Sequence, residues 1–331
     1  MVTDNIQMIT DNLTNCDFEG KNILISGGAG FIGSWICEVL LALDARVTCV
    51  DNFASGRKKN ISGLMNHPRF SFIQEDILSF SDSGDPLDYV MHLASRASPF
   101  EFDKFPIEIL KSNTLGTITM LEIAKKNKAK FLFTSTSEIY GDSEVFPTPE
   151  TYNGNVNPIG IRGCYDEAKR AGEALCMAYM RQYDLDVRIA RIFNTYGPRM
   201  RHDGFYGRVV PRFIAQALNN DPITIFGDGS QTRSFCYITD QVRGLLNLVS
   251  RNHLKGEVVN IGNPREMTIR ELGQLILDVT NSRSKMVFSP LPPDDPKRRY
   301  PDIRKAKKLL EWVPEISVTD GIRKTIDQSS P

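Results

Sequence analysis

The sequence predicts an α/β fold, in which a doubly wound parallel sheet is followed by a smaller C-terminal α/β domain. From Lys21 onward, short apolar runs rich in β-branched residues alternate with longer segments of helical periodicity, which is the pattern of βαβ units. A glycine-rich turn separates the first apolar run from the first helical segment. The length of 331 residues suits one large domain or two modest ones.

Six apolar runs are predicted to form the strands of the parallel sheet. Their apolar residues are nearly continuous, as expected where helices cover both faces of a sheet. The predicted strands are 22–26, 46–50, 70–74, 89–93, 130–135 and 187–192. The helices predicted between them are 31–43, 106–128 and 165–183.

Beyond Pro198 the predicted elements are shorter. Helices are expected at 210–219, 239–250, 269–279 and 303–310, and strands at 223–226 and 258–261. We expect residues 1–198 to form mainly the nucleotide-binding domain, with 1–20 as an N-terminal extension, and residues 199–331 to form mainly the substrate-binding domain. The boundary is soft because the chain can return to the first sheet. The proline-rich segment 289–301 is expected to be a loop.

Composition and charge exclude several classes of protein. Forty basic and forty acidic residues give a net charge of +0, which argues against a dedicated binder of nucleic acid or membrane surfaces. No apolar run approaches the roughly 20 residues of a membrane-spanning helix, and the polar, acidic first 20 residues do not resemble a signal peptide. Six scattered cysteines favour reduced thiols in a cytoplasmic protein, and neither they nor the four histidines have metal-ligand spacing.

The segment Gly27–Gly33 matches the turn that binds dinucleotides in Rossmann folds. Its glycines satisfy both G-x-G-x-x-G from Gly28 and G-x-x-G-x-x-G from Gly27. Glycines there permit a tight turn and a close approach of the backbone to a pyrophosphate, while the following helix supplies N–H donors. We therefore predict a Rossmann-type sheet that binds a dinucleotide.

Asp51 follows the second predicted strand, 18 positions after Gly33, where a carboxylate would bind the ribose hydroxyls. Because that carboxylate would repel a 2′-phosphate, the sequence favours NAD over NADP, although the basic segment 57–59 leaves NADP open. Asp76 and Ile77, which follow the third strand, would contact the adenine, and Ala94 and Ser95, which follow the fourth, would contact the pyrophosphate or the nicotinamide ribose. The alternative is that both pairs are ordinary strand-end residues. The predicted cofactor residues are Gly27, Gly30, Phe31, Ile32, Gly33, Asp51, Asn52, Asp76, Ile77, Ala94, Ser95, Tyr165 and Lys169.

Tyr165 and Lys169 are four residues apart, so on a helix they share one face. A neighbouring positive charge stabilises a phenolate, so we expect Lys169, together with the positive nicotinamide of a bound cofactor, to lower the pKa of Tyr165 and make it a usable base. Thr136 and Glu138 follow the fifth strand, at the edge of the sheet where ligands bind. Thr136 would hydrogen-bond a substrate hydroxyl and Glu138 would supply a carboxylate for proton transfer, unless the segment only caps a helix.

Together these motifs and three others resemble one known family. The motifs are Gly27–Gly33, Thr136-Ser137-Glu138, Asn157–Gly160, Tyr165–Lys169, Arg191–Arg199 and Asp294–Asp302. From about Lys21 to about Lys324 the chain resembles the UDP-glucuronate decarboxylases, or UDP-xylose synthases, of the extended short-chain dehydrogenase/reductase superfamily. Thr-Ser-Glu discriminates best, because sugar-nucleotide 4,6-dehydratases usually have Thr-Asp-Glu there.

The resemblance implies an internal redox cycle with bound NAD. Tyr165 would accept the proton of the sugar 4-hydroxyl, Lys169 would tune the phenol, and Thr136 would hydrogen-bond the same hydroxyl. The resulting 4-ketone lies β to the carboxylate, so CO₂ is lost readily, and protonation and reduction then give UDP-xylose. In this family Ser137, Glu138 and Arg299 assist the carboxylate and proton steps.

The resemblance also implies a substrate-binding set and a partner. The matching positions for the UDP moiety are Asn194, Arg199, Val209, Gln231 and Arg233, together with Arg299 for the sugar. The helices predicted at 106–128 and 165–183 would form a four-helix bundle with a second copy of the chain, which predicts a homodimer.

Three departures from the family pattern leave alternatives open. Arg96 stands where these decarboxylases typically have proline, Asn153 where they usually have tryptophan, and a short insertion lies around 205–207. A guanidinium at Arg96 would stabilise the substrate carboxylate and oppose its loss. The alternatives are a UDP-glucuronate 4-epimerase, a sugar-nucleotide 4,6-dehydratase, and a non-catalytic NAD-binding regulator.

Overall fold

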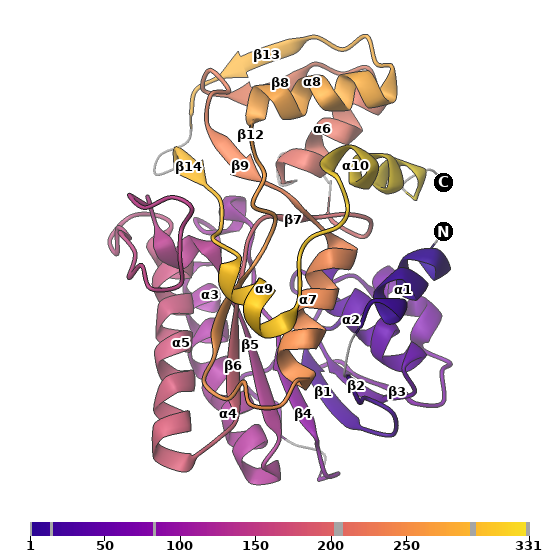
Figure 1. Cartoon of the computed structure of the whole chain (residues 1–331), viewed down its shortest axis with the longest axis vertical. Helices are drawn as coiled ribbons and strands as arrows, with labels where there is room; N and C mark the ends of the chain where they lie inside the picture. The colour runs from indigo at the N-terminus through magenta and orange to yellow at the C-terminus, as the bar shows by residue number, and fades with distance from the viewer. Residues whose placement is uncertain (1, 14–15, 82–83, 202–207, 292–295, 329–331) are drawn as a thin grey trace.

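The computed structural model describes residues 2–13, 16–81, 84–201, 208–291 and 296–328. A parallel sheet of seven strands lies at its centre, in the order β11-β6-β5-β4-β1-β2-β3 (Figure 1). The strands are β1 Asn22–Ser26, β2 Arg46–Val50, β3 Phe70–Ile73, β4 Tyr89–His92, β5 Lys130–Thr136, β6 Val187–Ile192 and β11 Val258–Ile261. The six strands predicted for the first half are confirmed, each to within one residue at either end.

Helices cover both faces of this sheet, as doubly wound connections require. On one side α4 (Leu115–Asn127) and α5 (Gly163–Tyr183) pack on β4, β5 and β6, with α3 (Pro106–Asn113) beside them. On the other side α2 (Phe31–Ala42) packs on β1 and β2, and α7 (Ile238–Ser250) on β5, β6 and β11. The short α9 (Arg304–Leu310) also lies against β11. The predicted α/β fold is therefore confirmed.

The helix predicted at 106–128 is divided in two. Thr114 leaves helical geometry at φ −114° and ends α3, and α4 begins at the next residue. The Thr114 hydroxyl donates to the Leu110 carbonyl at 2.7 Å, a side-chain bond that competes with the helical ladder. Periodicity alone did not reveal this break, because apolar residues continue at helical spacing on both sides of it.

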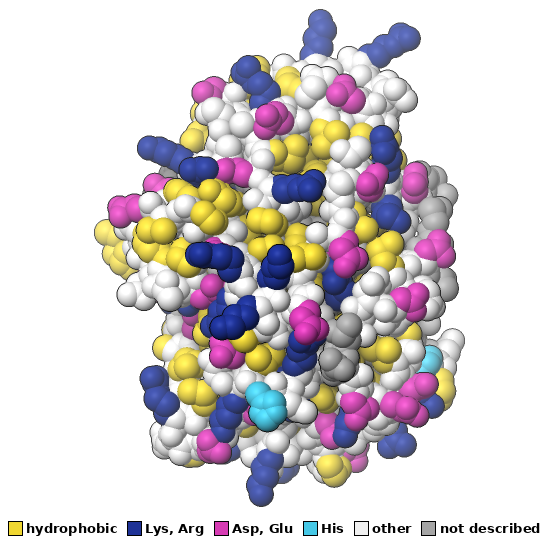
Figure 2. Space-filling view, in the orientation of Figure 1, with side chains coloured by type: hydrophobic (Ala, Val, Ile, Leu, Met, Phe, Trp, Pro, Cys, Tyr) yellow, Lys and Arg dark blue, Asp and Glu magenta, His cyan; other side chains and the backbone are white. Residues whose placement is uncertain are grey.

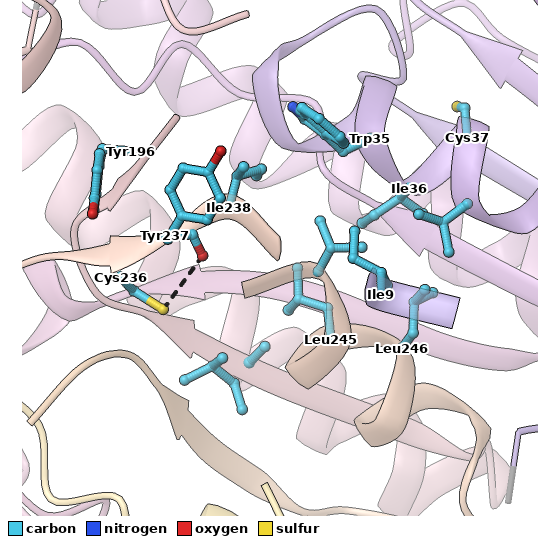
Figure 3. Close-up of a cluster of buried hydrophobic side chains, with 14 of the residues drawn as sticks. Ile9, Trp35, Ile36, Cys37, Tyr196, Cys236, Tyr237, Ile238, Leu245 and Leu246 are labelled. Atoms are coloured by element: carbon cyan, nitrogen blue, oxygen red, sulfur yellow. Dashed lines mark hydrogen bonds between the residues drawn. The ribbon is translucent and has the colours of Figure 1, made fainter. Parts of the chain in front are cut away.

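The N-terminal extension contains a helix that the sequence analysis did not predict. This helix, α1 (Val2–Asp11), packs against α2 and α7 and buries Ile6 and Ile9. Figure 3 shows Ile9 beside Ile36, Leu245 and Leu246 in the core between these three helices. Two buried isoleucines, with Asn5 donating to the Tyr237 hydroxyl, dock a mostly polar segment, so its composition gave little sign of a helix.

The C-terminal part of the chain forms smaller sheets in the upper part of Figure 1. One pairs β8 (Ile223–Phe226) with β13 (Met286–Ser289), and another has the order β12-β9-β14. The helices around them are α6 (Val209–Leu218), α8 (Ile269–Thr280) and α10 (Val318–Asp327). A further pair joins β7 (Thr195–Tyr196) to β10 (Cys236–Tyr237). The chain also returns to the first sheet through β11, which pairs with β6.

The segment 289–301, expected to be a loop, includes the end of β13 and the short strand β14 (Arg298–Arg299). This strand pairs with β9 (Thr232–Ser234), which also pairs with β12 (Glu266–Thr268). Arg298 donates from two nitrogens to the Glu266 carboxylate at 2.7 and 2.8 Å. Proline content could not reveal that part of this segment pairs with a distant strand.

Charged side chains of both signs lie interspersed on the face shown in Figure 2, as expected from the net charge of +0. Across the described ranges, no helix combines the length and the apolar character needed to cross a membrane. The same residues contain no group of three or more His, Cys, Asp or Glu side chains placed to hold a metal ion.

Candidate active site

A cavity opens at the carboxyl ends of the central strands, where the order of the sheet places it. The chain runs outward from β1 through β2 to β3 and then returns to the other side of β1 with β4. Such a reversal leaves a crevice between the loops that follow the two strands. The lining of the cavity includes Gly27 after β1, Ala94 after β4, Thr136 at the end of β5 and Asn194 after β6.

The glycine turn is shaped for close approach of three backbone segments. Gly27 has φ +75°, and a Cβ there would lie 2.6 Å from the Ala94 nitrogen. A Cβ on Gly33 would lie 2.3 Å from the Gly27 carbonyl oxygen. Gly30 precedes α2 without capping it by a side chain, so the amide groups at the start of the helix remain available for an anion.

Asp51 follows β2 and lies 8% exposed at the side of this turn. Its carboxylate accepts hydrogen bonds from the Ala29 amide at 3.0 Å and the Phe53 amide at 2.8 Å. Burial raises the pKa of Asp51 and is the largest influence, while the two amides act in the opposite direction. A carboxylate has four acceptor positions, so hydroxyl groups of a ribose can still donate to it.

Two buried polar atoms in the cavity wall lack a hydrogen-bond partner within the described chain. They are the Ser95 hydroxyl oxygen and the Asn194 side-chain nitrogen. Such atoms are costly to bury alone, and a polar ligand in the cavity would satisfy them. Together with the glycine turn they fit a dinucleotide and a polar substrate. Every residue predicted to bind the cofactor lies in the cavity wall, including Phe31, Ile32, Asn52, Asp76 and Ile77.

Tyr165 is almost completely buried at the floor of the cavity. Its ring stacks on Phe102 with the centroids 5.2 Å apart, and its hydroxyl hydrogen-bonds Thr136. Burial is the largest influence on the pKa of Tyr165 and raises it to about 12. The nearby charge of Arg208 and the hydrogen bond to Thr136 lower this pKa, but by less than burial raises it. The protein alone therefore does not lower this pKa, and the expected lowering, which also depends on the positive charge of a bound nicotinamide, stays a prediction.

The position and burial of Lys169 explain why its charge does not lower the pKa of Tyr165. Its ammonium donates to the Thr134 carbonyl at 2.7 Å and lies 4.8 Å from the centroid of the Phe133 ring. Burial lowers the pKa of Lys169 to about 7, so part of its charge is lost near neutral pH. Both side chains line the cavity on the same helix, as predicted, but the amine is directed at the end of β5.

Glu138 is the centre of a buried charge cluster. It lies on the short helix η4 (Ser137–Tyr140) that follows β5, and its carboxylate forms ion pairs with Arg299 and Arg162. Burial favours the neutral acid, but the two guanidinium groups outweigh it and hold the pKa of Glu138 below its ordinary range. Ser137 lies buried beside it in the cavity wall. Glu138 is therefore a carboxylate at neutral pH.

Asp166 joins the same cluster with the opposite tendency. One of its oxygens lies 3.7 Å from Arg162, and the other is buried without a hydrogen-bond partner in the described chain. Burial, followed by repulsion from Glu138, raises the pKa of Asp166 to about 7. Below about pH 7 and down to the low pKa of Glu138, Glu138 is therefore ionised while Asp166 is mainly protonated.

The predicted substrate residues fall into two groups. Asn194 and Arg199 line the cavity, and Arg199 also pairs with Glu38 of α2 and lies over the Trp35 ring at 4.3 Å. The others are absent from the lining formed by the described residues. They are Val209 at the start of α6, Gln231, Arg233 and Arg299.

Arg299 nevertheless reaches the cavity wall through its ion pair with Glu138. Its neighbour in the β9–β14 pairing is Arg233. The charge of Arg233 also lowers the pKa of Glu138, but its influence is smaller than that of burial, Arg299 or Arg162. Gln231 donates to the Phe226 carbonyl at 2.7 Å. The structure thus brings Arg299 and Arg233 together, whereas Gln231 lies just before β9.

Sequence reasoning missed several residues of the site. Arg162 binds Glu138, Arg208 lines the cavity and donates to the Ala97 carbonyl at 2.7 Å, and Glu101 pairs with Arg96 at 2.8 Å. Arg162 immediately precedes α5 and lies four positions before Asp166, and this spacing was a usable signal for the first. No local pattern identifies the other two, because their partners depend on how the loops fold.

The departures from the family pattern have different places in the structure. Arg96 lines the cavity, whereas Asn153 uses its backbone carbonyl to accept a hydrogen bond from Arg170 at 2.6 Å. Residues 205–207, the predicted insertion, lie outside the described residues.

Comparison with known proteins identifies the family. Residues 23–262 match the NAD dependent epimerase/dehydratase family. The chain belongs to this family. It is 49% identical over 314 residues to UDP-glucuronic acid decarboxylase 1 of Danio rerio, covering 94% of this chain and 73% of that protein. It is 46% identical over 317 residues to UDP-glucuronic acid decarboxylase 5 of Arabidopsis thaliana, covering 94% and 90%. The predicted resemblance to the decarboxylases is confirmed.

Solved structures agree on the fold. UDP-glucose 4-epimerase from Thermotoga maritima, solved with UDP-glucose, superposes with a TM-score of 0.85 at 33% identity, covering 93% of this chain and 98% of that one. UDP-glucuronic acid 4-epimerase from Bacillus cereus, solved with UDP-glucuronic acid and NAD, gives 0.83 at 33%, with the same coverage. The predicted extended short-chain dehydrogenase/reductase fold and the predicted NAD cofactor are confirmed.

Proposed function

We propose that this protein is an NAD-dependent UDP-glucuronate decarboxylase that forms UDP-xylose through a UDP-4-keto sugar. One observation carries the proposal: a single cavity is lined by the glycine turn, Asp51, Thr136, Tyr165 and Glu138, whose carboxylate pairs with Arg299. The chain's similarity to decarboxylases along nearly its whole length supports this reaction over the others that the fold can host.

The cofactor set is proposed as Gly27–Gly33 for the pyrophosphate and Asp51 for the adenosine ribose, with Ser95 and Lys169 toward the nicotinamide. When bound there, NAD⁺ would accept a hydride from carbon C4 of the sugar and return it after CO₂ has left. The orphaned Ser95 hydroxyl and the free amides at the start of α2 support this assignment.

Proton movement at the 4-hydroxyl is assigned to Tyr165, with Thr136 hydrogen-bonding the same oxygen. Oxidation leaves a ketone at C4, β to the carboxylate on C5. The bond from C5 to the carboxyl carbon then breaks, CO₂ departs, and the electron pair moves to the ketone oxygen as an enolate. Reprotonation at C5 restores the ketone before its reduction. Ser137, Glu138 and Arg299 are proposed to orient the carboxylate and to assist the proton step.

Asn194, Arg199, Val209, Gln231 and Arg233 are proposed to bind the UDP moiety. The orphaned Asn194 nitrogen in the cavity supports its role, and the position of Arg233 beside Arg299 supports a site shared with the sugar. On this division residues 1–198 bind mainly NAD, and residues 199–331 bind mainly the nucleotide sugar.

Two further features belong to the proposal. A homodimer through α3, α4 and α5 of each copy is supported by the exposed apolar residues Ile107 and Leu115, which are 56% and 52% exposed. A cytoplasmic location is supported by the six cysteines, none of which forms a disulfide.

Product analysis tests the reaction. The purified protein, incubated with UDP-glucuronate and no added reductant, should release CO₂ and accumulate UDP-xylose. Unchanged mass with a galacturonate isomer would indicate the 4-epimerase, which the B. cereus neighbour makes the second candidate. Dehydration of UDP- or dTDP-glucose would indicate a 4,6-dehydratase, and bound NAD without turnover of any sugar would indicate a regulator.

A further inference from the structure

An ion pair that the proposed reaction does not use lies inside the cavity. Arg96, in the segment after β4, donates from Nη1 to Oε1 of Glu101 at 2.8 Å. The two side chains are only 18% and 11% exposed. The guanidinium carbon also lies 4.1 Å from the centroid of the Phe105 ring. Because Arg96 and Glu101 line the same cavity as Thr136 and Tyr165, their charges act on whatever the cavity binds.

Glu101 is held in place by the turn that contains it. It ends the short helix η3 (Pro99–Glu101), where its amide donates to the Ser98 carbonyl at 2.9 Å. Its own carbonyl accepts from the Phe105 amide at 2.9 Å. The next residue, Phe102, is the one that stacks on Tyr165. The carboxylate is therefore fixed against Arg96 by the same turn that contacts the proposed base.

The pairing matters because of how charge moves during loss of CO₂. The substrate carboxylate is an anion before the bond breaks, and the departing CO₂ is neutral. A bare guanidinium beside that carboxylate would stabilise the starting anion more than the transition state and so slow the step. A carboxylate 2.8 Å from the guanidinium cancels most of its field at longer range.

We propose that Glu101 masks the charge of Arg96, and that this masking keeps the sugar carboxylate free to leave as CO₂. Arg96 and Glu101 thus act together as a specificity-determining pair, which sets how the site treats an acidic sugar. The proposal rests on the proposed decarboxylase function and deepens it. An unpaired Arg96 would favour retention of the substrate carboxylate. Its pairing with Glu101 explains how a decarboxylase site can contain it.

The test compares Glu101→Gln in two backgrounds. In the otherwise unchanged chain, Glu101→Gln should release labelled CO₂ from UDP-glucuronate at least about tenfold more slowly. It should also shift the ratio of dissociation constants toward UDP-glucuronate and away from UDP-glucose, which has no carboxylate. In the Arg96→Ala background the same substitution should change neither quantity by more than about twofold, because no guanidinium is left to unmask.

Asp103→Asn is the matched control. Asp103 is an exposed carboxylate two residues from Glu101 and is not among the described residues that line the cavity, so its removal makes the same change in net charge without touching the ion pair. The binding ratio should stay at its original value in this variant. Thermal unfolding of each variant shows whether the fold is intact.

An equal effect of Glu101→Gln in both backgrounds would overturn the proposal, because Glu101 would then act on the loop and not through Arg96. An unchanged binding ratio in Glu101→Gln alone would overturn it as well. Failure of the proposed function is a separate result: the unsubstituted protein would release no CO₂, while the binding ratios would still report on the pair.

Discussion

Burial and neighbouring charges together decide the protonation state of each ionisable side chain around the cavity. Burial is the largest influence on both Tyr165, whose pKa is raised to about 12, and Lys169, whose pKa is lowered to about 7. Two arginines reverse the effect of burial at Glu138, whereas Asp166, nearby in the same cluster, keeps a pKa raised to about 7. A phenol with so high a pKa becomes an effective base only when a further positive charge lies beside it, which a bound nicotinamide would provide.

Replacing Tyr165 by phenylalanine removes the proposed base and keeps the stacked ring. Release of CO₂ from UDP-glucuronate should fall by at least about 10²-fold, because general base catalysis typically contributes that much. Binding of UDP should change little. The control is Tyr183→Phe, at the exposed end of the same helix. A wild-type rate in Tyr165→Phe would remove this residue from the mechanism.

Asp166 gives a prediction about stability and pH. Its folded pKa of about 7 lies above the unfolded value of about 3.9, so the folded state holds an extra proton between these values. The free energy of unfolding contributed by Asp166 is therefore fully present below about pH 4 and is lost as the pH rises toward about 7. Asp166→Asn should gain stability relative to the unsubstituted protein across this range. Chemical denaturation at several pH values measures the difference, and a pH-independent difference would contradict the assigned pKa.

At the residue level, sequence reasoning located the motifs but not their electrostatics. Gly27, Asp51 and Thr136 were predicted because each belongs to a local pattern next to a strand end, and Tyr165 because it lies four residues before Lys169 on a predicted helix. The high pKa of Tyr165 in the protein alone was not predicted, because it depends on burial that the sequence does not report. The partners of Glu138 come from positions 24 and 161 residues away, and only the folded chain brings them together.

At the level of elements, strand ends position nearly the whole site. The loops after β1, β2, β4, β5 and β6 all contribute to the cavity wall. These strands were predictable because buried parallel strands are continuous apolar runs. The helices α1 and α10 were not, because each is a mostly polar segment that docks through a few apolar side chains. The position of β14 depends on a pairing with β9 that local patterns do not contain.

The close contact between α2 and the turn before it should make Gly33 intolerant of a side chain. Gly33→Ala would place a Cβ 2.3 Å from the Gly27 carbonyl oxygen, so the turn must open and the amides proposed to bind the cofactor must move. We expect affinity for NAD⁺ to fall at least about tenfold in calorimetric titrations. Gly63→Ala is the matched control, since no atom lies within 4 Å of its added Cβ. Equal affinities in the two variants would exclude the glycine turn as the cofactor site.

At the level of the whole molecule, the exposed side of α3 and α4 carries apolar residues that the chain leaves uncovered. Ile107 and Leu115 are both more than half exposed. If this surface joins two copies, Leu115→Asp should weaken the dimer at least about tenfold in sedimentation experiments, because a buried charge would face apolar side chains. Val287→Asp, on β13 of the C-terminal region, should leave assembly unchanged. A monomeric unsubstituted protein would contradict the proposed bundle.

The central claim is that the hydrogen taken from the sugar at C4 returns to the same carbon within one active site. UDP-glucuronate carrying deuterium at C4 tests it directly, with the protein and no added reductant. The account predicts CO₂ and UDP-xylose that keeps the deuterium at C4. Xylose that has lost the deuterium to solvent, or the absence of CO₂, would contradict it.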